Sequence, residues 1–174
     1  MNEENNQGFS LIEMLVVLVV FSILIILSTQ AVFLTLRNAK KAENLVKVRQ
    51  NLDNAVGVME RGLRSASYID CYSQTDDKSI AFDDVDGNGV TYSCTLGGTI
   101  TEEVLGPNAR SGNLTSDEVS MAACTFDCYP PNPSNGVPPK VTIDLEAQSV
   151  GSSGTEAATV STRTQVYVRI YDYQ

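Results

Sequence analysis

The sequence lacks histidine altogether and contains few basic side chains. Without histidine, Ser-His-Asp and Cys-His catalysis, His-ligated zinc and the commonest general base near neutral pH are excluded, and most hydrolase mechanisms with them. The 174 residues contain 12 Lys and Arg against 21 Asp and Glu, which gives a net charge of −9. This balance disfavours a chain-wide attraction to phosphates, so no direct nucleic-acid partner is expected.

The charge is divided unevenly along the chain. Residues 1–8 carry −2, residues 9–66 carry +3 and residues 67–174 carry −10. The sequence therefore consists of a short acidic leader, a mildly basic stem and a strongly acidic head.

Proline is absent before Pro107, and residues 9–36 are almost continuously apolar. At ~1.5 Å per residue, a helix over these positions is long enough to cross a hydrocarbon core of about 30 Å. A secretory signal peptide is the alternative, but it requires a basic n-region, a shorter apolar region and a small-residue cleavage site, none of which is clear here. The segment is therefore predicted to lie in a membrane.

A helical pattern continues directly from the apolar run. Apolar residues recur at intervals of three or four, as on one helical stripe: Leu45, Val48, Leu52, Val56, Met59 and Leu63. With no proline to break it, one helix of roughly 85 Å is predicted over residues 9–66. Its part up to residue 36 requires lipid or other helices around it, whereas the amphipathic part, residues 37–66, requires a folded domain along one face.

The sequence GFSLIEMLVVLVV begins at Gly8 and contains a lone carboxylate, Glu13, at the start of the apolar run. It resembles the class III signal of type IV pilins and pseudopilins almost residue for residue. The resemblance implies that a membrane-embedded prepilin peptidase cleaves between Gly8 and Phe9 and methylates the new amino terminus of Phe9. It also implies assembly with other pilin or pseudopilin subunits and with an inner-membrane assembly platform.

Glu13 also has a physical interpretation of its own. An unpaired carboxylate in hydrocarbon costs several kcal/mol, so a paired state is favoured. After cleavage, the expected partner is the amine of Phe9, from the same or the next subunit. This pair would set the axial register between subunits, because a slipped register leaves both charges unpaired. The alternative is an interfacial glutamate that complements the helix dipole.

The distribution of basic residues around the apolar run bears on orientation. The leader MNEENNQG contains no Lys or Arg, and the nearest basic cluster, Arg37, Lys40 and Lys41, follows the run. By the positive-inside rule alone, the head would be cytoplasmic. The class III signal and the cysteines of the head favour the opposite orientation. We therefore expect a single-pass protein of the cytoplasmic membrane with an extracytoplasmic head, and a cell-surface or periplasmic filament after assembly.

After Ala66, short β-type runs alternate with turn residues. Strands are predicted over residues 67–72, 79–82, 89–95, 99–103, 118–126, 140–147 and 160–171. In the last of them Val166, Val168 and Ile170 alternate with other residues, so one side can pack on the helix stripe. The predicted fold is α+β, a long N-terminal helix whose amphipathic half packs on an antiparallel β-sheet, as the pilin resemblance also implies. J-type pseudopilins and W-type minor pilins are the most similar subgroups.

All four cysteines, Cys71, Cys94, Cys124 and Cys128, lie in the head. An even number outside a membrane predicts two disulfides, with three possible connectivities. We favour Cys71–Cys94, which closes a loop of about 24 residues and stabilises the head by roughly 3 kcal/mol. The remaining pair, Cys124–Cys128, requires a turn. A zinc site of four cysteines and, for a cytoplasmic head, buried free thiols are the alternatives.

Residues 84–89, DVDGNG, match the first half of a calcium-binding loop. The candidate ligands are Asp84, Asp86 and Asn88, which place oxygen atoms at alternate positions. The twelfth position of such a loop is Thr95 instead of the bidentate glutamate, so a calcium site here would be weak. An Asn-Gly hairpin turn between two strands is the alternative.

The leading hypothesis is a structural subunit that acts by assembly and is not an enzyme. It would be a minor pilin or pseudopilin of a type IV pilus, a competence filament or a type II secretion-like filament. The alternative is a single-pass, membrane-anchored extracellular binding module that does not polymerise and whose binding could depend on calcium. A mature protein that retains its leader would favour this alternative.

Overall fold

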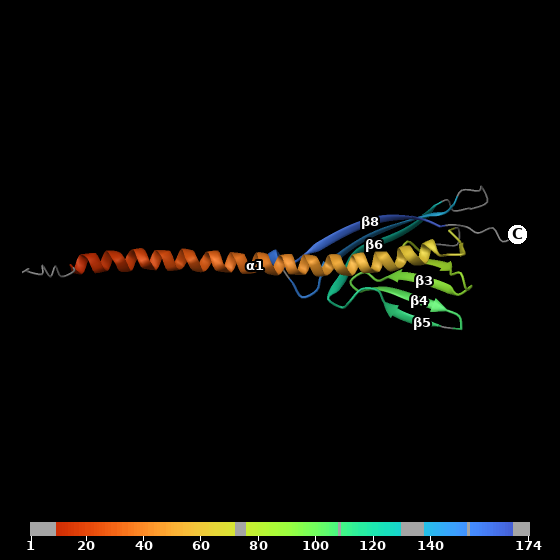
Figure 1. The fold of residues 1–174 in the computed structure, drawn as a ribbon, viewed down its shortest axis with the longest axis horizontal. Helices are drawn as coiled ribbons and strands as arrows, with labels where there is room; N and C mark the ends of the chain where they lie inside the picture. Colours follow the sequence, from red (N-terminus) through yellow and green to blue (C-terminus); the bar gives the residue numbers. More distant parts are fainter. Residues whose placement is uncertain (1–9, 72–75, 108, 130–137, 153, 169–174) are drawn as a thin grey trace, which may run out of the picture. The chain divides into compact units, whose positions relative to one another are not determined.

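The computed structural model describes residues 10–71, 76–107, 109–129, 138–152 and 154–168. The chain divides into two compact units, Met1–Lys40 and Lys41–Gln174. A single long helix, α1 (Leu11–Arg64), begins in the first unit and ends in the second, and every described strand follows it (Figure 1). The predicted α+β class, one long N-terminal helix followed by antiparallel strands, is confirmed.

The ends of α1 lie within two residues of the predicted bounds. At its start, the Ser10 carbonyl accepts hydrogen bonds from the backbone N–H groups of Glu13 and Met14, at 3.0 and 3.2 Å. At its end, the backbone N–H of Ser65 donates to the Arg61 carbonyl, and the Ser65 hydroxyl donates to the Gly62 carbonyl. These bonds occupy backbone groups that a helix terminus otherwise leaves unpaired.

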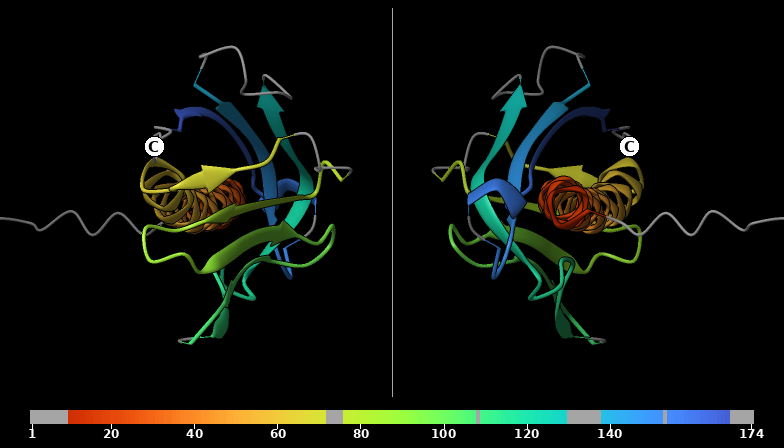
Figure 2. Two further views of the ribbon diagram at one scale, coloured as in Figure 1. Left: turned by 90° about the vertical axis from the view of Figure 1, so that its right-hand side faces the viewer. Right: turned by 90° about the vertical axis from the view of Figure 1, so that its left-hand side faces the viewer.

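The strands of the second unit form two antiparallel sheets (Figure 2). Sheet A has the order β1 (Tyr68–Ile69), β2 (Ser79–Asp83), β3 (Gly89–Cys94), β4 (Ile100–Leu105) and β5 (Arg110–Asn113). Sheet B has the order β6 (Val119–Tyr129), β7 (Lys140–Ser149) and β8 (Thr159–Tyr167). A short 3-10 helix, η2 (Gly154–Glu156), lies between β7 and β8.

Each predicted strand has a counterpart, but the sequence did not indicate two sheets or strand β5. Strand β5 was not predicted because it has no alternation of apolar and polar residues: all four of its residues are exposed and none is apolar. The expected alternation in β8 is confirmed where it is described, since Val166 and Val168 are each only 1% exposed. Ile170 lies outside the described residues.

Backbone hydrogen bonds join the two sheets along one seam. The N–H of Phe126 in β6 donates to the Asp77 carbonyl just before β2, at 2.8 Å. Further along β6, Met121 exchanges hydrogen bonds with the turn between β3 and β4, accepting from Gly97 and donating to Gly98. The Lys78 ammonium donates to the Cys124 carbonyl at 2.7 Å. The unpaired edge of β6 is therefore partly satisfied by sheet A.

The second half of α1 buries one face against both sheets (Figure 1). The buried residues of the helix are Val48, Leu52, Ala55, Met59 and Leu63. They form one hydrophobic core with apolar side chains of sheet A, such as Ile80, and of sheet B, such as Ile143. The predicted stripe is confirmed except at its margins, because Leu45 is 40% exposed and Val56 only partly buried.

Gly62 allows the aromatic core to approach α1 closely. A Cβ atom at this position would lie 2.2 Å from the Tyr92 hydroxyl oxygen and 3.2 Å from Phe82 Cζ. Tyr92 is 1% exposed, and its ring packs on that of Phe82 with centroids 5.4 Å apart. An alanine here would overlap the Tyr92 hydroxyl unless that ring shifted, so the close approach favours glycine despite its poor helix propensity.

We expect Gly62→Ala to lower the free energy of unfolding of the head by about 1–3 kcal/mol, as overpacked core substitutions do. Gly57→Ala is a matched control on the same helix, because its added Cβ would meet only Arg61 Nη1 at 3.6 Å. Gly57→Ala should leave the free energy of unfolding unchanged or raise it by up to about 1 kcal/mol, because alanine has the higher helix propensity. Urea unfolding of both full-length variants in detergent measures the difference; equal stability of the two variants would contradict this packing.

Candidate functional site

The apolar half of α1 exposes its side chains on every face. Between Leu11 and Leu36, each large hydrophobic side chain is at least 50% exposed. The segment has a mean hydropathy of 3.0 over an 18-residue window, none of which is buried within the protein. A helix of this length and composition is able to cross a membrane. An apolar surface of this extent requires lipid or other protein around it.

Three hydroxyl groups of this half are satisfied within the helix. Ser22, Thr29 and Thr35 each donate to the backbone carbonyl four residues earlier, at 2.7 to 2.9 Å. These side chains therefore place no unpaired hydroxyl donor in an apolar environment.

Glu13 is the only charged residue from Ser10 to Leu36 and lies in the first turn of α1. Gly8 and Phe9, the predicted cleavage and methylation positions, lie outside the described residues. Pairing of Glu13 with the Phe9 amine therefore stays a prediction. The structure places Glu13 at the end of the helix where that amine would begin the processed chain.

The four cysteines form two disulfides, but with a connectivity that differs from the predicted one. Cys71 is bonded to Cys128 and Cys94 to Cys124, with Cα–Cα distances of 5.3 and 6.6 Å. No cysteine is free. The predicted pairs Cys71–Cys94 and Cys124–Cys128 are therefore wrong.

Strand geometry explains the difference. Cys124 and Cys128 both lie in the extended strand β6, where four residues span about 13 Å, well beyond the ~7 Å limit for bridged Cα atoms. Cys71 follows β1 and Cys94 ends β3, and β2 lies between these strands. Two strand spacings amount to about 9.6 Å, which is again too far. Each disulfide instead joins a cysteine at the margin of sheet A to one in β6.

The predicted calcium ligands lie in the turn between β2 and β3. The backbone N–H groups of Asp86 and Asn88 donate to Asp84 Oδ1 at 2.9 and 2.8 Å, and the Asn88 amide donates to Asp84 Oδ2 at 3.0 Å. The Asn88 side-chain hydrogen bond is the main cause that lowers the pKa of Asp84 below its usual value. Both carboxylate oxygens are thus used within the turn.

This arrangement supports the hairpin alternative, because Asp83 of β2 pairs with Gly89 of β3 across the turn. Within the described part of the chain, no three His, Cys, Asp or Glu side chains gather where they could hold a metal ion. Calcium binding at Asp84, Asp86 and Asn88 stays a hypothesis.

One buried polar contact lies on the inner face of sheet A. Burial raises the pKa of the Tyr92 hydroxyl, and the neighbouring Glu102 carboxylate raises it further. Glu102 also pairs with Arg110 of the edge strand β5, with Arg110 Nη2 3.3 Å from its carboxylate oxygen. Burial and the Glu102 carboxylate both favour the neutral form of Tyr92, whose ring packs in the core against Phe82.

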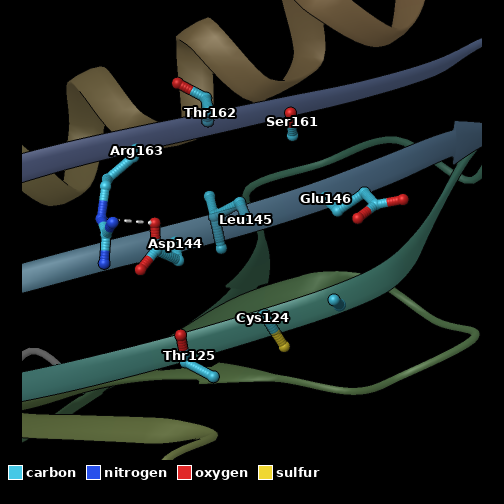
Figure 3. Close-up of a pocket in the computed structure, with 9 residues that line it drawn as sticks. Cys124, Thr125, Asp144, Leu145, Glu146, Ser161, Thr162 and Arg163 are labelled. Atoms are coloured by element: carbon cyan, nitrogen blue, oxygen red, sulfur yellow. Dashed lines mark ion pairs between the residues drawn. The ribbon is translucent and has the colours of Figure 1, made fainter.

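Sheet B has a hollow of about 400 Å³ on its surface (Figure 3). Asp144 and Arg163 form an ion pair across neighbouring strands at its edge, at 3.0 Å. Thr125, Glu146 and Ser161 add polar groups along its sides (Figure 3). Sequence analysis did not predict this hollow, since it depends on which residues of three strands lie opposite one another.

Residues 5–29 match the family described as the prokaryotic N-terminal methylation motif. No curated protein and no solved structure matches the chain. The matched segment includes Gly8, Phe9 and Glu13, so the resemblance carried by GFSLIEMLVVLVV is confirmed. This motif is the class III signal of type IV pilins, and it supports the assignment of the chain to the type IV pilin and pseudopilin family.

Proposed function

We propose that the protein is a minor pilin or pseudopilin of a type IV pilus, competence or type II secretion-like filament. One observation supports this most strongly: the methylation motif leads directly into a helix whose apolar half is exposed on every face. In this proposal the prepilin peptidase cleaves between Gly8 and Phe9 and methylates Phe9. The processed subunit then acts by assembly.

The apolar helix serves two successive environments. Before assembly, residues 9–36 hold the subunit in the cytoplasmic membrane, where an inner-membrane platform extracts it. After assembly, the same surface packs against the helices of neighbouring pilin or pseudopilin subunits. Glu13 then pairs with the amine of Phe9 and sets the axial register, because any other register leaves buried charges unpaired.

The two disulfides support an extracytoplasmic head. Disulfides form and persist in oxidising compartments and are rare in the cytosol. Both bonds join the two sheets of the head, and all four cysteines take part. In this orientation the head lies on the periplasmic or cell-surface side, and the filament is on that side too.

A membrane-anchored binding module is the second candidate. The hollow on sheet B is the observation that favours it, because its polar lining lies on a described surface of the head. Such a module would keep its helix in the membrane and would not polymerise. The two candidates differ in whether the leader is removed.

We expect the protein extracted from membranes of its own host to start at N-methylated Phe9. Intact mass and N-terminal sequencing measure this directly. A Gly8→Leu variant should instead retain the whole leader, because the glycine of the class III signal is lost. A wild-type chain that still starts at Met1 would contradict the filament proposal and favour the anchored module.

A further inference from the structure

Three cations follow the apolar run of α1 directly. Arg37, Lys40 and Lys41 are all exposed, and we call them the basic collar. Their spacing places them on one face of the helix. No acidic residue lies between Glu13 and Glu43, so this stretch of the helix is purely positive.

The position of the basic collar corresponds to the surface of a membrane. As a helix, residues 11–36 span roughly 39 Å, which covers a hydrocarbon core of about 30 Å and reaches the headgroup layer. Arg37 is the first charged residue beyond that span. Long basic side chains lay their apolar stems along hydrocarbon and keep the charged group among the headgroups.

Acidic residues follow within the next turns of the helix, beginning with Glu43. The Asn44 amide donates to the Glu156 carbonyl at 3.0 Å, and Lys47 pairs with Glu43 and Glu118 at 3.4 and 3.8 Å. The cation that follows the collar is thus bound by acidic groups of the chain itself. An anionic surface is attracted to the three cations of the collar.

The orientation of the chain adds a second argument. With the head outside the cytoplasm, the collar lies on the side where the positive-inside rule disfavours Lys and Arg. The leader contains no basic residue to counter this bias. Lipid phosphate on that side would offer these cations a favourable interaction that offsets the bias.

We propose that the basic collar binds anionic phospholipid headgroups of the leaflet on the head side. This contact fixes the depth of the helix in the membrane and has to be released when the subunit is extracted. It requires a membrane-anchored helix but not a filament, so its failure and the failure of the assembly proposal are distinguishable.

The test uses the full-length protein in lipid vesicles. Because the chain contains no tryptophan, Leu36→Trp introduces a single fluorescent reporter next to the collar, at a side chain that is 60% exposed. Brominated phosphatidylglycerol and brominated phosphatidylcholine both quench tryptophan on contact. The ratio of the quenching by the two lipids gives their relative binding constant at the collar. We expect the anionic lipid to be preferred, and the preference to weaken as salt is added.

The variant Arg37→Gln/Lys41→Gln, in the same reporter background, should reduce the preference about fivefold for each charge removed. Lys40 is kept because it takes part in an interaction within the protein. The matched control is Arg49→Gln/Arg64→Gln, which removes the same charge from side chains that are 69% and 65% exposed further along α1. The control should retain the preference of the parent.

Two outcomes would overturn the proposal. One is equal quenching by both lipids in the parent protein. The other is an unchanged lipid preference in Arg37→Gln/Lys41→Gln. If that variant also associates less with itself in phosphatidylcholine vesicles, the collar binds the acidic head of a second copy instead.

Discussion

Replacing Glu13 with glutamine should leave the protein in the membrane but reduce its incorporation into filaments by at least about a hundredfold. In the proposed assembly, the substitution would remove one partner of a buried pair and leave the Phe9 amine unpaired, which would cost about 3–5 kcal/mol. A factor of ten corresponds to about 1.4 kcal/mol, so the expected loss exceeds a hundredfold. Membrane insertion should not suffer, because a neutral amide is less costly in hydrocarbon than a carboxylate.

The measurement compares the amount of the subunit in sheared filaments with the amount in the membrane fraction. Ser22→Ala is a suitable control, since the Ser22 hydroxyl donates to the Leu18 carbonyl of its own helix. Glu13→Asp, which retains the charge, should restore part of the incorporation. Wild-type incorporation of Glu13→Gln would show that Glu13 only complements the helix dipole at a membrane interface.

Removing either disulfide should produce the largest loss of head stability. Cys94 and Cys124 are separated by 30 positions and Cys71 and Cys128 by 57, for which the chain-entropy relation gives about 4 kcal/mol for each bond. We therefore expect the double variants Cys94→Ala/Cys124→Ala and Cys71→Ala/Cys128→Ala to unfold at clearly lower urea concentrations. Unfolding of the full-length protein in detergent, followed by circular dichroism, measures both.

A third double variant, Cys71→Ala/Cys94→Ala, tests the connectivity itself. With the bonds as the structure has them, it breaks both disulfides and leaves Cys124 and Cys128 unpaired. Under the connectivity first predicted from the sequence, the same variant would contain no free thiol. Maleimide labelling of the denatured protein counts the thiols; a count of zero would contradict the structure.

Features that depend on neighbouring residues were predictable from the sequence. The 3.6-residue period of Val48, Leu52, Met59 and Leu63 predicted the buried face of α1, and the sequence DVDGNG predicted a turn between two strands. The class III signal is equally local, because its residues are contiguous. Helical periodicity, turn formation and the cleavage motif each depend on residues that lie close together in the sequence.

Features that depend on which strands become neighbours were not predictable. The disulfide partners follow from β2 lying between β1 and β3 and from β6 running past the margin of sheet A. No spacing of the cysteines contains that information. Strand β5 was not predictable because none of its four residues is apolar, and the hollow on sheet B was not predictable because it depends on which residues of β6, β7 and β8 lie opposite one another.

The order of the disulfides along the chain has a mechanical consequence. The Cys94–Cys124 bond is nested within the Cys71–Cys128 bond, so the outer bond encloses strands β2 to β5 and nearly all of β6. A pulling force applied between α1 and β8 would pass through the outer bond and bypass this part of the chain. About 200 Å of contour length is thereby withheld from extension. Under tension the head would lengthen only by the segments outside the bond, which include β1, whereas strands β2 to β5 would remain unloaded.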